Sequence, residues 1–359
     1  MRRRPSLTLW RRRIGALLFA SVLLADVAAL ACTRFVYHGA DGRVLTARTM
    51  DWKSDIATHL WILPRGTNRS GETGANSLRW TSKYGSVIAS AYDVSSADGV
   101  NEAGLAANLL WLVESQYPKF EPGSKPGLSI SAWAQYVLDS FGTVAEAVTA
   151  LRAEPFTIVT DSVPGEQLIA TLHLSLSDAS GDSAIIEYIG GRQVIHHDRK
   201  HQVMTNSPIF EQQLALNAYW RQIGGTVMLP GTNRAADRFA RASFYVNAIP
   251  KFEEPDRAVA SVFSVIRNVS VPFGLSTPDE PNISSTRWRT VVDHARKLYF
   301  FESALTPNVF WVDLKKIDFS AAGGVRRLDL GKDQTTIHAG DATGAFVPSA
   351  PFVFLGAKG

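Results

Sequence analysis

The stretch CTRFVYHGADGRVLTARTMDW, residues 32 to 52, decides the fold of this chain. Its first seven residues, Cys32 to His38, are mostly β-branched and aromatic, and Arg43 to Met50 also reads as a strand. Between the two lies Gly39 to Gly42, a strong turn signal. The stretch therefore predicts a β-hairpin that begins at Cys32.

The length of the turn sets which residues of this hairpin lie opposite each other. A turn over Gly39 to Gly42 places Cys32 opposite Thr49, and one further residue in the turn places it opposite Arg48. Both registers stay open. In either one, Cys32 lies beside Arg48 and within a few residues of Asp51.

Residues 1 to 31 have the order of a secretory signal peptide. Arginines up to Arg13 precede the apolar run Ile14 to Ala25, and the segment ends in Ala29-Leu30-Ala31. A membrane anchor is the alternative, because a span needs roughly 20 apolar residues, but Asp26 and the small-residue ending favour cleavage. We expect a periplasmic or secreted protein, with the general and twin-arginine export routes both open.

The charge of the chain gives no reason to expect a nucleic-acid partner. The formal net charge is +4, but six arginines and a single acid lie in the first 31 residues. Without them, 31 basic residues face 32 acidic ones. Nucleic acids and anionic membranes attract proteins with a surplus of basic residues, so neither is an expected partner of the mature form.

Cys32 is the only cysteine of the chain, and cleavage after Ala31 would make it the first residue. One explanation is lipidation, which would give a lipid-anchored periplasmic binding protein attached through Cys32. Lipoprotein signals favour a large apolar residue three places before the cysteine, where Ala29 stands. The other explanation, which this position favours, is catalysis by an N-terminal thiol.

An N-terminal cysteine carries a nucleophile and a base on one residue. Its α-amino group has a pKa of about 7.7 to 8.0 and its thiol a pKa of about 8.5, so no separate histidine is needed. We expect Arg48 to favour the thiolate and Asp51 to hold the amino group. The alternative for Arg48 and Asp51 is an ordinary ion pair at the strand edge.

The remaining sequence predicts an α+β fold with layered antiparallel sheets, because strands and helices come in runs and do not alternate. No linker divides residues 32–359, so we expect one domain. Asp98 to Glu102 is interpreted as a turn that leads into a strand. The expected strands are Leu105–Val113, Leu168–Leu176, Ala184–Ile189, Gln193–His197, Lys297–Ser303 and Val309–Leu314, and the expected helices are Ser129–Leu138, Thr143–Arg152, Phe210–Ile223, Ala235–Val246 and Asp256–Val269.

Other catalytic motifs are missing from the sequence. It contains no G-x-S-x-G, S-x-x-K, H-E-x-x-H or Walker motif. His197 and His201 have the spacing of helical metal ligands, and His196 is next to them, but the segment is interpreted as a strand end and a surface turn. We expect neither a metal nor a cofactor.

Taken together, the motifs resemble those of the choloylglycine hydrolase family, the penicillin V acylases and conjugated bile salt hydrolases, which are N-terminal nucleophile hydrolases. Each motif alone is weak, but their order and spacing along the mature chain are specific. The matching stretches are Cys32 to Phe35, Arg48 to Trp52, Asp98 to Leu105, Thr205 to Pro208, Leu229 to Gly231 with Asp237 to Phe239, and a C-terminal set with Trp288, Asp293, Lys297, Tyr299 and Phe300.

The resemblance implies a four-layer αββα sandwich of two antiparallel sheets flanked by helices. It also implies a small-molecule substrate whose non-peptide amide is cleaved through an S-acyl intermediate, and a homotetramer, the common assembly of the family. The family's functional positions match Cys32, Arg48, Asp51, Asn206 and Arg238. Asn206 would donate to the oxyanion. A turn asparagine and a solvated helix face are the alternatives for Asn206 and Arg238.

Trp111 stands where many bile salt hydrolases carry an asparagine that helps to form the oxyanion hole. Its backbone N–H could still serve as that donor, while its indole fills the substrate pocket together with Trp52. Ordinary core packing is the alternative for both tryptophans. An aromatic pocket favours phenoxyacetyl or fatty acyl groups, so the expected substrates are penicillin V and N-acyl homoserine lactones, as in the Gram-negative branch, ahead of bile salts. Asn108 lies near the expected site without an assigned role.

Overall fold

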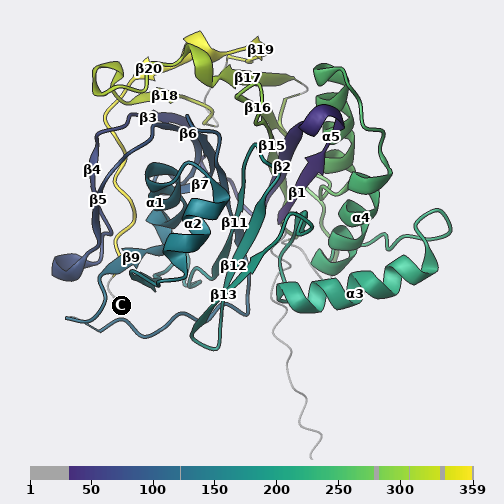
Figure 1. The fold of residues 1–359 in the computed structure, drawn as a ribbon, viewed down its shortest axis with the longest axis horizontal. Coiled ribbons are helices and arrows are strands. Elements are labelled where there is room, and N and C mark those ends of the chain that lie inside the picture. Colours follow the sequence, from purple (N-terminus) through teal and green to yellow (C-terminus); the bar gives the residue numbers. More distant parts are fainter. Residues whose placement is uncertain (1–31, 122, 279–282, 307, 332–335, 358–359) are drawn as a thin grey trace, which may run out of the picture.

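Two large β-sheets make up the centre of the molecule (Figure 1). The structure is a computed structural model that describes residues 32–121, 123–278, 283–306, 308–331 and 336–357. The predicted signal peptide, residues 1–31, lies outside the described residues.

One sheet contains the predicted hairpin, which pairs with β15 (Ser285–Asp293) at the centre of this sheet. Within the described ranges it has seven strands, in the order β14 (Val203–Met204), β1 (Cys32–His38), β2 (Val44–Trp52), β15, β16 (Leu298–Ser303), β17 (Val309–Asp313) and β19 (Gly340–Asp341). Its pairs are antiparallel apart from β17 and β19. Both faces of β1 and β2 are buried, which fits their near-continuous apolar and β-branched sequences.

The second sheet faces the first. Its nine described strands run in the order β13 (Arg192–His197), β12 (Ser183–Ile189), β11 (Leu172–Ser177), β8 (Ala106–Trp111), β7 (Ser95–Asn101), β6 (Ser86–Ala91), β3 (Leu60–Leu63), β18 (Arg326–Leu328) and β20 (Val347–Pro348). Two short pairs, β4 (Asn68–Ser70) with β5 (Arg79–Thr81) and β9 (Gly127–Ser129) with β10 (Thr157–Val159), lie outside the large sheets.

Helices cover the outer faces of both sheets (Figure 1). α1 (Trp133–Ser140) and α2 (Val144–Leu151) contact the second sheet, whereas α4 (Ala235–Ala248) and α5 (Pro255–Asn268) contact the first. α3 (Phe210–Ile223) packs on α4. This is the four-layer αββα sandwich that we expected, and the expected helices are present with small shifts at their ends. The one exception is α1, which begins only at Trp133, after a 3₁₀ turn.

Neither expected hairpin register is correct. Cys32 pairs with Met50 and His38 with Val44, because Arg43 belongs to the turn. The turn closes with bonds from Gly39 N–H to Arg43 O (2.8 Å) and from Arg43 N–H to Ala40 O (2.9 Å). The extra residue therefore comes from the second strand, and the first strand keeps His38.

The interpretation of Asp98 to Glu102 as a turn is also wrong. Asp98 to Asn101 form the end of β7, and the reversal comes only after Asn101. Gly99 is needed there for space, since a Cβ atom at this position would lie 2.6 Å from Cγ2 of Ile88 on the neighbouring strand. The central strand β15 and the strands β3 and β6 were not expected from the sequence at all.

Candidate active site

Cys32 is the first residue of β1, and its side chain is buried, with 4% of the residue exposed. The register places Cys32, Arg34, Arg48 and Met50 in directly opposed pairs. Arg34 and Arg48 reach carbonyl oxygens of the second sheet, those of Leu176 and Leu109, so this face of the hairpin points between the sheets.

Asn206 and Arg238 lie directly beside Cys32. The Oδ1 atom of Asn206, which follows β14, accepts hydrogen bonds from Cys32 N–H and from Nη2 of Arg238 (2.9 Å). Arg238, on α4, also donates from Nη1 to Cys32 O (2.6 Å) and to Thr33 Oγ1 (2.5 Å). Only 1% of Arg238 is exposed, so it is not part of a solvated helix face. Its neighbour Arg241 instead binds the carbonyl oxygen of Pro230 (2.7 Å).

Asp51 lies near Cys32 but does not hold the cysteine nitrogen as we expected. Its Oδ1 accepts from Thr286 (2.6 Å) and its Oδ2 from Thr49 (3.1 Å), and Thr49 Oγ1 in turn accepts from Thr33 N–H (2.9 Å). The bond from the Cys32 nitrogen goes to Asn206. Burial raises the pKa of Asp51 to about 6, although the charge of Arg238 and these hydrogen bonds oppose the rise.

Arg48 makes other contacts in place of the strand-edge ion pair with Asp51. Its Nη2 donates to Leu109 O (2.9 Å), and its guanidinium carbon lies 4.5 Å from the ring centroid of Trp288. The residue is 1% exposed, and its Nε and Nη1 atoms have no hydrogen-bond partner among the described residues. The charge of Arg48 is therefore available to an anion that forms nearby.

Burial favours the protonated form of the Cys32 thiol. Burial raises its pKa, and this effect outweighs the lowering by Arg48 and Arg238, while the charge of Asp51 adds to the rise. As we expected, Arg48 lowers the pKa of the thiol and so favours the thiolate, but the net shift of this pKa is upward. The sulfur therefore needs a base when it reacts, and Arg48 and Arg238 lie close enough to stabilise the charge that then develops.

An apolar cavity of about 110 Å³ opens beside Cys32. Trp52 and Trp111 both line it, with ring centroids 5.5 Å apart and planes inclined at 45°. Trp52 Nε1 donates to Tyr92 OH (2.8 Å), and Trp111 O accepts from Asn206 Nδ2 (2.7 Å). The expected aromatic pocket is thus present, and Asn206 joins it to the nucleophile. Val94, Ser131 and Leu355 also line this cavity.

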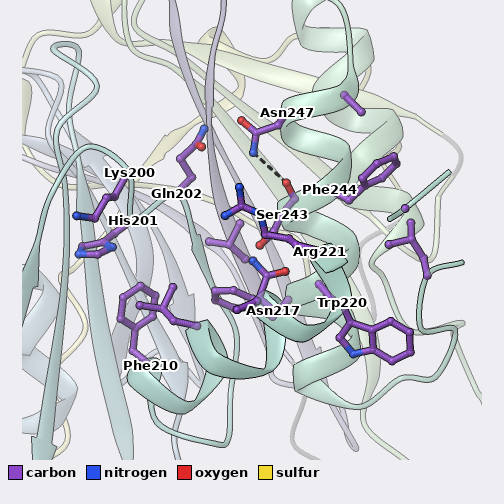
Figure 2. A pocket seen from close by; sticks show the side chains of 18 residues that line it. Lys200, His201, Gln202, Phe210, Asn217, Trp220, Arg221, Ser243, Phe244 and Asn247 are labelled. Atoms are coloured by element: carbon purple, nitrogen blue, oxygen red, sulfur yellow. Dashed lines mark hydrogen bonds between the residues drawn. The ribbon is translucent and has the colours of Figure 1, made fainter. Parts of the chain in front are cut away.

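A larger cavity, of about 730 Å³, lies between α3, α4 and residues 200 to 203. Figure 2 shows its mixed lining, with Phe210, Trp220 and Phe244 beside Asn217 and Arg221. None of the residues that the sequence predicts for the active site lines this cavity. Size alone therefore does not identify the reactive site.

Three histidines, His173, His196 and His197, contact buried or half-buried carboxylates. Buried Glu187 contacts His173 Nδ1 and His196 Nε2 (3.3 Å each) and accepts from the N–H of Phe210, the first residue of α3 (3.0 Å). His197 pairs with Asp182 (2.7 Å). In the described part of the chain, no group of three or more His, Cys, Asp or Glu residues is arranged to hold a metal ion. Nor does any described helix have the length and apolar character to cross a bilayer.

Sequence reasoning missed several groups that support the site. Thr49 and Thr286 hold the carboxylate of Asp51, Tyr92 holds Trp52, and Glu187 fixes the start of α3 just after Asn206. Thr49 carried a usable signal, because it lies two residues before Asp51 and strand residues with that spacing point to the same face. The others come from distant segments, and the sequence carries no sign that they meet.

Comparisons with known proteins show the family of the chain. The model of the family "Linear amide C-N hydrolases, choloylglycine hydrolase family" matches residues 32–326. A penicillin V acylase from Pectobacterium atrosepticum is 60% identical over 365 residues, which cover 96% of this chain and 97% of that protein.

Solved structures give the same result. The structure of penicillin V acylase from Agrobacterium tumefaciens has a TM-score of 0.85 and 69% identity, and covers 90% of this chain and 100% of its own. A mutant conjugated bile acid hydrolase from Clostridium perfringens has a TM-score of 0.72 but 23% identity, covering 86% of this chain and 99% of its own. The second likeness shows the fold alone.

Proposed function

The chain belongs to the choloylglycine hydrolase family of linear amide C–N hydrolases, and on this premise we propose that it is an acylase whose nucleophile is the N-terminal thiol of Cys32. One observation supports this most: the nitrogen of Cys32 is bound by Asn206, while the residue lines an apolar cavity with Trp52 and Trp111. The nucleophile, the group that holds its nitrogen and the pocket for the acyl group thus all lie at Cys32.

In the proposed reaction the α-amino group of Cys32 takes the thiol proton as the sulfur attacks the carbonyl carbon of the amide. The raised pKa of the thiol makes this transfer part of the reaction. Arg238 holds the carbonyl oxygen of Cys32, which keeps the residue in place, and the charge of Arg48 favours the negative sulfur. Asp51 acts through Thr49, which accepts from the N–H of Thr33.

The tetrahedral intermediate then collapses. Nδ2 of Asn206 and the backbone N–H of Trp111 stabilise the oxyanion, the C–N bond breaks, and the amine leaves with the proton from the α-amino group. The acyl group stays on the sulfur. Water, deprotonated by the same amino group, then attacks the thioester carbon. The C–S bond breaks, the acid is released, and the proton passes from the amino group to the sulfur, which restores the thiol.

We propose penicillin V as a substrate, because the acylases that are 60% and 69% identical carry that activity in their names. N-acyl homoserine lactones are the second candidate class, since the same apolar cavity would accept an alkyl chain. Bile salt conjugates are the weaker alternative, because the bile acid hydrolase with a solved structure is only 23% identical.

For the mature form we propose one domain, residues 32–359, periplasmic or secreted after removal of residues 1–31. Neither a metal nor a cofactor enters the reaction. Self-association into a homotetramer is supported by apolar side chains exposed on α3 and the loop after it. These are Leu214, Leu216, Tyr219, Val227 and Met228.

Two measurements test the proposal. Intact mass of the exported protein separates a chain that begins at a free Cys32 from the rival, a lipid-anchored binding protein, which carries extra acyl mass on the same residue. A panel of penicillin V, penicillin G, a glycine-conjugated bile salt, and long-chain and short-chain acyl homoserine lactones should then show the first substrate cleaved well. A lipidated chain that cleaves none of them would contradict the proposal.

A further inference from the structure

The C-terminal tail of the chain reaches the cavity beside Cys32. After β20 the chain passes β3, and its last described residues lie beside β9 (Figure 1). Leu355, in this last segment, lines the cavity together with Cys32, Trp52 and Trp111. The family model matches only as far as residue 326, so this part of the cavity wall lies outside the family match.

Aromatic contacts fix the tail just before Leu355. The ring of Phe352 packs edge-on against Trp61, with centroids 5.2 Å apart. Phe354 is buried, and its ring lies 5.0 Å from that of Phe352 and 5.7 Å from the guanidinium carbon of Arg69. The tail is therefore a packed segment of the fold up to the cavity.

Hydrogen bonds then hold both backbone polar groups of Leu355. Its N–H donates to Val94 O (2.9 Å), and its carbonyl oxygen accepts from the hydroxyls of Ser129 (2.6 Å) and Ser131 (2.9 Å). Val94 and Ser131 line the cavity themselves. With its backbone held on both sides, Leu355 has a defined place in the wall.

The same bonds connect the tail to a cavity tryptophan. Val94 closes the turn that follows β6, and this turn contains Tyr92, whose hydroxyl accepts from Trp52 Nε1 (2.8 Å). The tail thus braces the turn that holds Trp52. The described hydrogen bonds of Leu355 go to Val94, Ser129 and Ser131, and none goes to Arg48, Asn206 or Arg238.

We propose that Leu355 is a specificity-determining residue, and that its side chain limits the size of the acyl group that fits beside Cys32. The inference rests on the proposed function, in which this cavity receives the acyl group. A cavity of about 110 Å³ leaves little spare room, so the volume of one wall residue changes which acyl groups fit. Removal or addition of a few carbon atoms in such a pocket changes discrimination by about 10-fold or more.

The test compares Leu355→Ala and Leu355→Phe with the wild-type protein. All of these chains begin at Cys32. Val353→Ala is the matched control, because Val353 lies two residues earlier on the same tail and is 71% exposed. The readout is the ratio of kcat/KM for dodecanoyl homoserine lactone to that for penicillin V. We expect Leu355→Ala to raise this ratio by about 10-fold, Leu355→Phe to lower it, and Val353→Ala to leave it unchanged. The change should lie mainly in KM, with thermal unfolding near that of the wild type.

The two proposals fail in different ways. If the wild-type protein hydrolyses both substrates and the Leu355 variants keep its ratio, the role of Leu355 is overturned and the acylase stands. An equal loss of kcat on both substrates would also overturn it, because it would show that the tail only braces Trp52. A wild-type protein that begins at Cys32 and cleaves neither substrate would overturn the proposed function, and with it the role of Leu355.

Discussion

The polar ring around Cys32 and the apolar wall of its cavity are built in opposite ways. The polar ring, here Arg48, Asp51, Asn206 and Arg238, is almost completely buried, and most of its bonds are charge-assisted or go to backbone groups. The cavity wall, here Trp52, Trp111 and Leu355, comes from separate strands and the C-terminal tail, and what it offers a substrate is almost entirely apolar.

The difference shows how the two regions should respond to change. Buried polar groups that share partners fail together, because removing one leaves another buried group unpaired. The wall meets the substrate with apolar side chains, so a change in these side chains mainly alters which substrate fits. We therefore expect loss of turnover from the polar ring and a change of selectivity from the wall.

The largest effect should come from Cys32→Ala. Loss of the nucleophile should lower kcat by roughly 10⁴-fold to 10⁶-fold, with the fold intact, because alanine fits the space of the thiol. Turnover and thermal unfolding, measured on chains that begin at residue 32, test this. A Cys32→Ala protein with wild-type turnover would show that the thiol is not the nucleophile.

The second-largest loss of turnover should come from Asn206→Ala. We expect a loss of roughly 10²-fold to 10³-fold in kcat, the usual cost of one oxyanion donor. Asn247→Ala, at an exposed position on α4, is the matched control and should be silent. If Asn206→Ala changed only the substrate preference and left kcat intact, it would contradict the division of roles between the polar ring and the wall.

The third prediction concerns the support behind the polar ring, where Glu187 holds the start of α3. Burial raises the pKa of Glu187, but hydrogen bonds and charge from His173 and His196 lower it to about 2. Because the folded-state pKa lies below the unfolded value of 4.5, the stability that Glu187 gives is present above pH 4.5 and lost as the pH falls towards 2.

Glu187→Gln should therefore lower the free energy of unfolding at pH 7 by roughly 3 kcal/mol, and by much less near pH 2. Denaturant unfolding at both pH values tests this. The control is Glu211→Gln, at an exposed position on α3. Equal losses at the two pH values would show that the charge of Glu187 is not what holds α3.

Trp111→Ala should have the smallest effect on turnover and a clear one on selectivity. Aromatic contacts contribute about 0.5 to 1.5 kcal/mol beyond area burial, which corresponds to roughly 2-fold to 10-fold in kcat/KM. We expect penicillin V and long-chain acyl homoserine lactones to lose more than bile salts, which the wild type should cleave less well. Trp220→Ala, beside the larger cavity, is the control. Unchanged selectivity in Trp111→Ala would show that the indole is only core packing.

The sequence predicts most of the fold because its local signals agree with the tertiary structure. α3 begins and ends at the predicted residues, and Thr143 caps α2 as its motif suggests. The predicted hairpin register is wrong by one residue, because the shape of the turn, and not its composition, decides whether Arg43 joins a strand. The prediction of a turn around Gly99 is wrong because the glycine is needed there for close packing against the neighbouring strand, and not for a turn.

The candidate site could be predicted only where motifs mark it. Cys32, Arg48 and Trp111 stand in recognisable stretches, and the structure brings them together with the other expected residues. Thr286 and Leu355 could not be found, because their roles depend on a bulge in β15 and on the path of the tail. The direction of the Cys32 pKa was also missed, since burial cannot be read from neighbouring charges.

The central claim is that the α-amino group of Cys32 is the base, and one measurement tests it directly. Two purified forms are compared, one beginning at Cys32 and one that keeps Leu30 and Ala31, each with its first residue verified by intact mass. With penicillin V, only the form that begins at Cys32 should turn over and acquire an acyl group on the sulfur, because an amide nitrogen cannot take the thiol proton. Equal turnover by the form that keeps Leu30 and Ala31 would contradict the account.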